Sequence, residues 1–213
     1  MRVVSEFVTS AAGAGGFPAG GMPEIAVVGR SNVGKSTLIN ALVRQKLART
    51  SAAPGKTRLA NFYRVAADGR PVFHLVDLPG FGYARGGDRS RNEFDALAVE
   101  YFGDRIGQSA GAFPGDQDEE KRPGPVLSGV LLLVDSRHPG LEADRGAWAW
   151  LRHLGAERHA VATKVDKLTR AERQRHLAEL ERIFSGPVTP VSAQTGEGLD
   201  ALWNLIARLL TRP

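Results

Sequence analysis

One segment of the sequence combines the residue types that can hold a chain of phosphates. It reads Gly29-Arg-Ser-Asn-Val-Gly-Lys-Ser36 and fits the pattern G-x-x-x-x-G-K-[ST]. Gly29 and Gly34 let the backbone bend so that its N–H groups can face phosphate oxygens. Lys35 can reach the β- and γ-phosphates, and the Ser36 hydroxyl can bind Mg²⁺. The segment therefore predicts a P-loop; a glycine-rich turn without a ligand is the less favoured alternative.

A second segment supplies a carboxylate and a flexible backbone N–H. Asp77-Leu-Pro-Gly80 closes an apolar run and fits the pattern D-x-x-G. The carboxylate can hold a water molecule of Mg²⁺, and the Gly80 N–H can meet a γ-phosphate. Such a tetrapeptide is common and can be an ordinary turn. Its position after the P-loop is what favours a nucleotide-hydrolysing site.

A third segment can select the base of a nucleotide. Thr163-Lys-Val-Asp166 follows another apolar run and resembles the guanine motif [NT]-K-x-D. The Asp166 carboxylate can accept hydrogen bonds from N1–H and the 2-amino group of guanine, a donor pair that adenine lacks. Backbone N–H groups near Ser192-Ala193 could contact guanine O6. A charged loop and a plain cap are the alternatives for these two segments, but their order along the chain favours a guanine site.

The elements that must position these segments form an alternating pattern. Short apolar runs at residues 25–28, 61–65, 71–76, 130–134, 159–163 and 188–191 predict strands. Asp68-Gly69 between the second and third runs predicts an antiparallel hairpin. Helices are expected over residues 35–44, 142–154, 170–184 and 199–210, the third beginning with a capping box at Thr169 and Glu172. This pattern indicates an α/β domain with a mostly parallel sheet and the site at the strands' carboxyl ends.

Composition narrows the class of protein further. The chain has 213 residues, a formal charge of +5 and no cysteine, which excludes disulfide scaffolds, thiolate metal sites and a cysteine nucleophile. The longest apolar run, residues 126–134, is too short to span a membrane, and Glu6 interrupts any signal peptide. We therefore expect a cytoplasmic protein without a membrane partner. Residues 107–125 are expected to form a flexible insertion; a functional lid is the less favoured reading.

Taken together, these segments resemble the EngB-type bacterial GTPases over residues 7–210. The supporting stretches are Pro23-Glu-Ile-Ala26, the P-loop, Leu38-Ile-Asn-Ala-Leu42, Ala48-Arg-Thr-Ser51, Pro54-Gly-Lys-Thr57, Asp77-Leu-Pro-Gly-Phe-Gly-Tyr-Ala84, Asp135-Ser-Arg-His-Pro139 and Thr163-Lys-Val-Asp-Lys-Leu168. The resemblance implies one Ras-like P-loop GTPase domain over residues 1–213, with residues 1–23 as a lead-in. Its sheet would have six strands, mostly parallel with one antiparallel strand, and helices on both faces.

The resemblance also implies a function and a set of residues. The protein would bind GTP or GDP with Mg²⁺, hydrolyse GTP, act as a monomer on the large ribosomal subunit or its precursor, and support cell division and septation. Lys35, Thr57 and Gly80 would be catalytic, with Ser36 and Thr57 at the metal. The nucleotide contacts would be Gly29, Arg30, Ser31, Asn32, Val33, Gly34, Lys35, Ser36, Thr37, Gly55, Lys56, Thr57, Arg58, Leu59, Asp77, Leu78, Pro79, Gly80, Thr163, Lys164, Val165, Asp166, Val191, Ser192 and Ala193.

Three residues modify this expectation. Lys56 stands where family members often have Arg, which keeps the charge but loses the planar guanidinium. Phe81 stands where Ras-like proteins keep a water-orienting Gln, so we expect slow intrinsic hydrolysis. Asn32 is a candidate ligand for K⁺ beside the phosphates; a loop-capping role is the equal alternative.

The charge of the chain is concentrated around the two expected switch segments. Residues 44–91 hold ten basic and three acidic residues, a net charge of +7. This basic switch face predicts contact with ribosomal RNA phosphates, although some of the charge can simply be solvated. Two other functions stay open: a P-loop kinase of a small molecule, and a GTP-dependent RNA-modification module.

Overall fold

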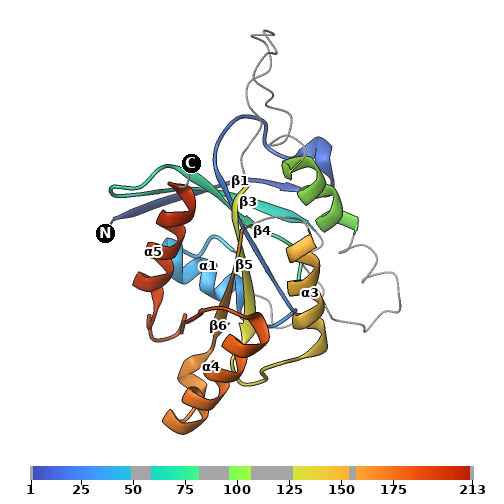
Figure 1. Ribbon diagram of the computed structural model, residues 1–213. Helices are drawn as coiled ribbons and strands as arrows, with labels where there is room; N and C mark the ends of the chain where they lie inside the picture. Colours follow the sequence, from blue (N-terminus) through green and yellow to red (C-terminus); the bar gives the residue numbers. More distant parts are fainter. Residues whose placement is uncertain (1, 49–58, 82–95, 107–126, 154–156, 212–213) are drawn as a thin grey trace.

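The fold is built on one seven-stranded sheet (Figure 1). The computed structural model describes residues 2–48, 59–81, 96–106, 127–153 and 157–211. The strands lie in the order β1-β3-β4-β2-β5-β6-β7. Their bounds are β1 Val3–Ala11, β2 Glu24–Gly29, β3 Ala60–Ala67, β4 Phe73–Asp77, β5 Leu127–Asp135, β6 Arg158–Thr163 and β7 Val188–Pro190.

Helices cover both faces of this sheet. They are α1 Lys35–Val43, α3 Glu142–His153, α4 Arg170–Phe184 and α5 Leu199–Leu210, and residues 96–106 are helical as well. There are also two short 3₁₀ turns: η1 Ala14–Gly16 lies between β1 and β2, and η2 Val165–Lys167 lies between β6 and α4. The capping box predicted for α4 is confirmed: the Glu172 N–H donates to Thr169 Oγ1 at 3.3 Å, and the Thr169 N–H donates to Glu172 Oε2 at 2.9 Å.

The central strand β2 shows how the sheet separates two hydrophobic layers. Ile25 and Val27 pack in the layer that holds α1 and α5. Ala26 and Val28 point to the opposite layer, with α3, α4 and the helical residues 96–106. Successive side chains of a strand point to opposite faces, so a continuous apolar run is needed where both faces are covered. Figure 1 shows α1 and α5 on one side of the sheet and α3 on the other.

The direction of the strands agrees with the prediction, but their number does not. Among the described strands, β3 alone runs opposite to the rest, and it pairs with β4 through the predicted hairpin, where Gly69 has a φ of +71°. The Ras-like α/β fold class is confirmed. The expected sheet of six strands is corrected to seven, because β1 extends the sheet by pairing antiparallel with β3.

β1 was not predicted because its sequence hardly alternates. Only Ser5 and Ala11 of this edge strand are buried, while Val4, Phe7 and Val8 are exposed. Its place in the sheet comes from backbone hydrogen bonds to β3, which a local pattern does not encode. The lead-in expected over residues 1–23 therefore includes β1 and η1, whereas the insertion expected over residues 107–125 lies outside the described residues.

A buried charge fixes the helical residues 96–106 against β2. Arg105 Nε donates to Glu24 Oε2 at 2.9 Å, and the Tyr101 hydroxyl donates to the same oxygen at 2.9 Å. Both Arg105 and Glu24 are almost fully buried. Burial, followed by the negative charge of Glu24, raises the pKa of Tyr101 well above its ordinary value. None of the helices in the described part of the chain has the length and apolar character needed to cross a membrane.

Candidate functional site

Five strand ends bring the predicted segments to one edge of the sheet. β2, β4, β5, β6 and β7 are parallel, so their carboxyl ends lie on the same side. The P-loop follows β2, Asp77 ends β4, and the Thr163 and Ser192 segments follow β6 and β7. β2 has β4 on one side and β5 on the other, which is the kind of switch point where such sheets form ligand crevices.

The turn from β2 into α1 depends on two glycines. Gly34, the N-cap of α1, has a φ of 101°, in the left-handed region that favours glycine. A Cβ on Gly29 would lie 2.9 Å from the carbonyl oxygen of Leu133, so β5 leaves no room for a side chain there. The turn therefore directs the N-terminus of α1, with its free N–H groups and positive dipole end, toward this edge of the sheet. Val33 is buried below it, and Thr37 is exposed.

Lys35 and Asp77 form a buried ion pair within the site. The Lys35 ammonium bonds to Asp77 Oδ1, and the two side chains are 8% and 2% exposed. Asp77 and the half-buried Ser36 offer hard oxygen donors. Within the described ranges, no cluster of three or more His, Cys, Asp or Glu residues could hold a metal ion. These donors therefore fit Mg²⁺ that arrives with phosphate oxygens and water, rather than an all-protein metal cage.

The D-x-x-G segment lies directly against the P-loop. The Ser31 N–H donates to the carbonyl oxygen of Phe81 at 3.1 Å, and the Phe81 N–H donates to the carbonyl oxygen of Gly29 at 3.3 Å. A Cβ on Gly80 would approach the Ser31 nitrogen to 3.0 Å, so glycine permits this close contact. Leu78 and Pro79 are buried beneath it. The two phosphate-directed segments are thus one structural unit.

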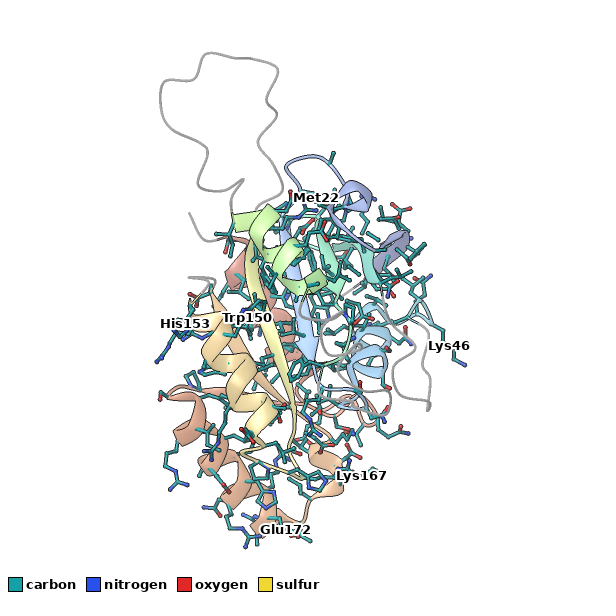
Figure 2. The ribbon with its side chains drawn as sticks, turned by 90° about the vertical axis from the view of Figure 1, so that its right-hand side faces the viewer. Met22, Lys46, Trp150, His153, Lys167 and Glu172 are labelled. Carbon is teal, nitrogen blue, oxygen red and sulfur yellow. The ribbon has the colours of Figure 1, made fainter. Side chains whose placement is uncertain are left out.

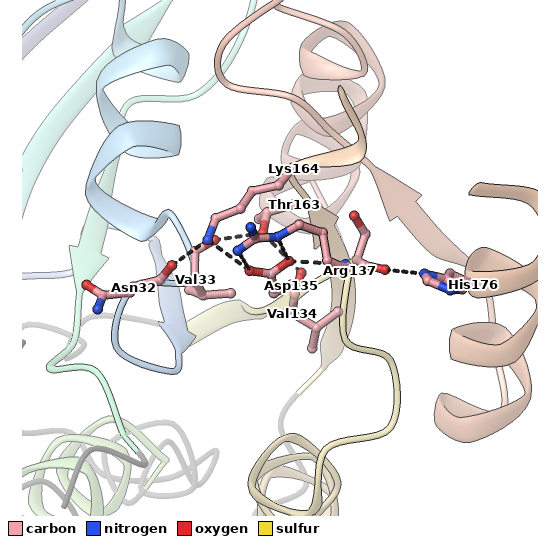
Figure 3. A network of polar contacts seen from close by, with 9 residues as sticks. Asn32, Val33, Val134, Asp135, Arg137, Thr163, Lys164 and His176 are labelled. Atoms are coloured by element: carbon pink, nitrogen blue, oxygen red, sulfur yellow. Dashed lines mark hydrogen bonds and ion pairs between the residues drawn. The ribbon is translucent and has the colours of Figure 1, made fainter. Parts of the chain in front are cut away.

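The third segment is tied to the P-loop from the other side (Figure 3). Lys164, with a left-handed φ of 61°, donates from Nζ to the carbonyl oxygen of Asn32 at 2.6 Å. The Thr163 hydroxyl donates to the carbonyl oxygen of Val33 at 2.7 Å. The segment that would read a base and the loop that would hold phosphates are therefore fixed relative to each other.

The carboxylate proposed to read the base is oriented by Ser192. The Ser192 hydroxyl donates to Asp166 Oδ1 at 2.7 Å and accepts from the Thr195 N–H at 3.1 Å. This hydrogen bond is the main cause that lowers the pKa of Asp166, so the group is an anion at neutral pH. Val191 is fully buried, Val165 is buried and Ala193 is half-buried. These apolar side chains anchor the segments that hold Asp166 and Ser192.

Asp135 and Arg137, for which the sequence predicted no role, complete the hydrogen-bond network around Lys164. Asp135, at the end of β5, accepts from Lys164 Nζ at 2.9 Å and from Arg137 Nε and Nη2 at 2.9 and 2.7 Å (Figure 3). Burial opposes the charge of Asp135, but the hydrogen bonds from Arg137 and Lys164 outweigh it and lower its pKa to about 2. The sequence did hold a signal for Asp135, because this residue is acidic and ends an apolar strand, as Asp77 does.

The remaining predicted contacts either lie outside the described residues or have exposed side chains. Gly55, Lys56, Thr57 and Arg58 lie outside the described residues, so the first switch and the second metal ligand stay predictions. Leu59 is described and is 38% exposed. Asn32 has a φ of 64° and an exposed side chain.

Comparison with known proteins gives a consistent family. A sequence model described as "50S ribosome-binding GTPase" matches residues 24–164. A probable GTP-binding protein EngB of Pelotomaculum thermopropionicum is 40% identical over 209 residues, which cover 96% of this chain and 94% of that protein. Another of the same name from Anaeromyxobacter sp. strain K is 40% identical, covering 98% of this chain and 93% of the relative.

Solved structures show the same fold at lower identity. The crystal structure of a probable GTP-binding protein EngB has a TM-score of 0.64 at 23% identity, covering 88% of this chain and 98% of that one. Aquifex aeolicus Era bound to GDP and aluminium fluoride has a TM-score of 0.70 at 21% identity, covering 89% of this chain and 57% of that one. With a P-loop, a D-x-x-G segment and a T-K-V-D segment at one sheet edge, and full-length relatives at 40% identity, the chain belongs to the EngB family of GTP-binding proteins, a family of ribosome-binding GTPases.

Proposed function

We propose that this protein hydrolyses GTP to GDP and phosphate and acts as a switch in the assembly of the large ribosomal subunit, in support of normal division and septation. The observation that carries the proposal is the Lys164 bridge, which ties the T-K-V-D segment to the P-loop carbonyl of Asn32. This hydrogen bond would hold the proposed guanine site next to the proposed phosphate site. Family membership supports the ribosomal part of the proposal.

The base-reading residue favours GTP over ATP. Asp166 is ionised, and its Oδ1 is oriented by the Ser192 hydroxyl. A carboxylate can only accept hydrogen bonds, so it suits the two adjacent donors of guanine and repels the N1 acceptor of adenine. This chemistry disfavours a small-molecule kinase that uses ATP. The description of the matching family model, a ribosome-binding GTPase, favours the ribosomal switch over a GTP-dependent RNA-modification module.

Hydrolysis in this arrangement rests on positioning and on charge stabilisation. Lys35 would hold the β- and γ-phosphates, and the Gly80 N–H would meet the γ-phosphate. Ser36 and Thr57 would hold Mg²⁺, and the Asp77 carboxylate would hold one of its water molecules; the ion supplies positive charge at the phosphate oxygens when bound. Phe81 offers no side-chain hydrogen bond to an attacking water, so intrinsic hydrolysis should be slow. A rapid rate in the free protein would contradict this.

A monovalent cation is proposed as an aid to hydrolysis at Asn32. The side-chain amide of Asn32 forms no hydrogen bond with any described residue. The described residues therefore offer no backbone group that this amide caps. Its oxygen could hold K⁺ beside the phosphates. GTP hydrolysis that is equally fast in K⁺ and Na⁺ would remove this part of the proposal.

The remaining parts of the proposal concern the cell. We propose that the protein is a cytoplasmic monomer that contacts ribosomal RNA through the basic switch face, residues 44–91. Much of this segment lies outside the described residues, so its sequence charge of +7 is the support for it.

Two measurements test the function. In the first, binding of GTP, XTP and ATP is measured for the natural protein and for Asp166→Asn. Xanthine carries a carbonyl where guanine has its 2-amino group, so an amide side chain should shift preference from GTP toward XTP. In the second, co-sedimentation with large ribosomal subunits is measured with GTP and with GDP. Equal ATP and GTP binding would overturn the guanine site, and binding to no subunit or precursor in either state would overturn the ribosomal role.

A further inference from the structure

A hollow between α3 and α4 is lined by three arginines and by none of the residues predicted to contact the nucleotide. Its volume is about 360 Å³, and it is lined by Arg145, Trp148, Ala149, Arg152, Arg182 and Ile183. The first four belong to α3 and the last two to α4. Figure 2 faces this side of the molecule, with Trp150 and His153 marking the C-terminal half of α3. We call this feature the α3–α4 groove.

The arginines of the groove have no ion-pair partner within the described structure. Arg145, Arg152 and Arg182 are exposed, and none of them forms an ion pair with a carboxylate in the described part of the chain. Other arginines behave differently: Arg173 pairs with Glu197, and Arg137 pairs with Asp135. Three guanidinium groups around one hollow create a positive potential that favours an anionic partner.

The aromatic residue of the groove, Trp148, is already packed against other side chains and is poorly placed to stack on a base. Trp148 would be the natural platform, but the Arg158 guanidinium carbon lies 4.7 Å from its ring centroid. The Phe184 ring packs on it as well, with centroids 5.0 Å apart at an angle of 57°. Because Trp148 is already engaged by these neighbours, the groove offers guanidinium donors rather than a free aromatic face. Guanidinium groups recognise phosphates in a bidentate manner.

We propose that the α3–α4 groove binds the phosphate backbone of ribosomal RNA, without reading its base sequence. The inference rests on the proposed ribosomal function and adds a second contact surface to the basic switch face. RNA is favoured over an acidic protein segment because the groove presents several separate cations, which suits a regularly spaced polyanion. The contact does not require the nucleotide-dependent segments, so it should persist with GTP and with GDP.

The test uses a triple variant of the full chain, Arg145→Gln, Arg152→Gln and Arg182→Gln. A matched control removes the same charge at exposed positions outside the groove, by Arg170→Gln, Arg175→Gln and Arg208→Gln. Binding is measured to purified large ribosomal subunits and to protein-free large-subunit RNA, between low and moderate salt. GTP affinity and the melting temperature establish that each variant is folded; the double variant Arg152→Gln and Arg182→Gln is the substitute if the triple variant is unstable.

The groove variant should bind both probes roughly tenfold or more weakly, with the slope of log K against log salt reduced by about 2. The control should keep most of its affinity, since total charge alone would affect both variants alike. Equal binding by the groove variant and the control would overturn the proposal. Weaker binding to subunits with unchanged binding to protein-free RNA would also overturn it, in favour of an acidic ribosomal protein. If the natural protein bound neither probe, the ribosomal function itself would be refuted.

Discussion

Asp135 should stabilise the nucleotide site through its charge, and the substitution Asp135→Asn tests this. The asparagine keeps the size of the side chain but removes the negative charge that lies between Lys164 and Arg137. Without it, two cations remain near each other, and Lys164 loses one of the two groups that hold its ammonium. We expect a less stable protein with a more mobile Lys164.

The magnitude follows from the pKa of Asp135, which falls from the ordinary 3.8 to about 2. Each pKa unit is worth about 1.4 kcal/mol, so the charged form contributes about 2 kcal/mol to the free energy of unfolding. Because the pKa is lowered in the folded state, this stability is present above pH 4 and is lost as the pH falls through 2. The deficit of Asp135→Asn should therefore be largest at neutral pH and about half as large at pH 3.

Urea unfolding at several pH values between 7 and 3 measures this deficit. GDP affinity, measured alongside, should weaken by roughly tenfold, the equivalent of one charge-assisted hydrogen bond, because Lys164 also holds the P-loop. Asp200→Asn, which removes an exposed carboxylate in the first turn of α5, is the matched control and should change stability by less than about 0.5 kcal/mol.

Two results would contradict a stabilising role of the Asp135 charge. The first is an Asp135→Asn protein that unfolds at the same urea concentration as the natural protein at pH 7. The second is a deficit that stays constant from pH 7 to pH 3, because loss of shape rather than loss of charge would then be its cause.

Three further substitutions test buried contacts in the fold. Asp144 is buried, its Oδ1 has no hydrogen-bond partner among the described residues, and burial raises its pKa to about 6. The substitution Asp144→Asn should therefore stabilise the protein at pH 8 by about 3 kcal/mol. Urea unfolding should show this advantage disappearing as the pH falls toward 4. Arg105→Met leaves the buried Glu24 carboxylate uncompensated and should cost about 3–5 kcal/mol, and recovery in the double variant with Glu24→Gln would support this cause. Gly198→Ala places a Cβ onto the carbonyl oxygen of Pro190 at a φ of 76°, so its melting temperature should fall; an unchanged value would contradict the clash.

Much of the α/β pattern could be predicted from local sequence. The strands and helices that hold the nucleotide site have strong signals, such as the apolar run of β5 and the capping box at Thr169. These signals depend on hydrogen bonds and burial within a few residues, which a single sequence displays. β1 could not be predicted, because its place depends on pairing with β3, whose paired residues come 49 to 64 positions later in the chain.

In the candidate site, local sequence specifies which groups can do chemistry. The spacing of Gly29, Gly34 and Lys35 specifies a phosphate loop, and Asp166 specifies the hydrogen-bond pattern of a base. How these groups are held depends on the folded arrangement of the chain. It joined Lys164 to the carbonyl oxygen of Asn32, placed Asp135 and Arg137 beside it, and gathered three arginines from α3 and α4 around one groove. The physical reason is that these contacts form between strand ends and helix faces distant in the sequence, and only packing of the sheet and its helices brings them within hydrogen-bond distance.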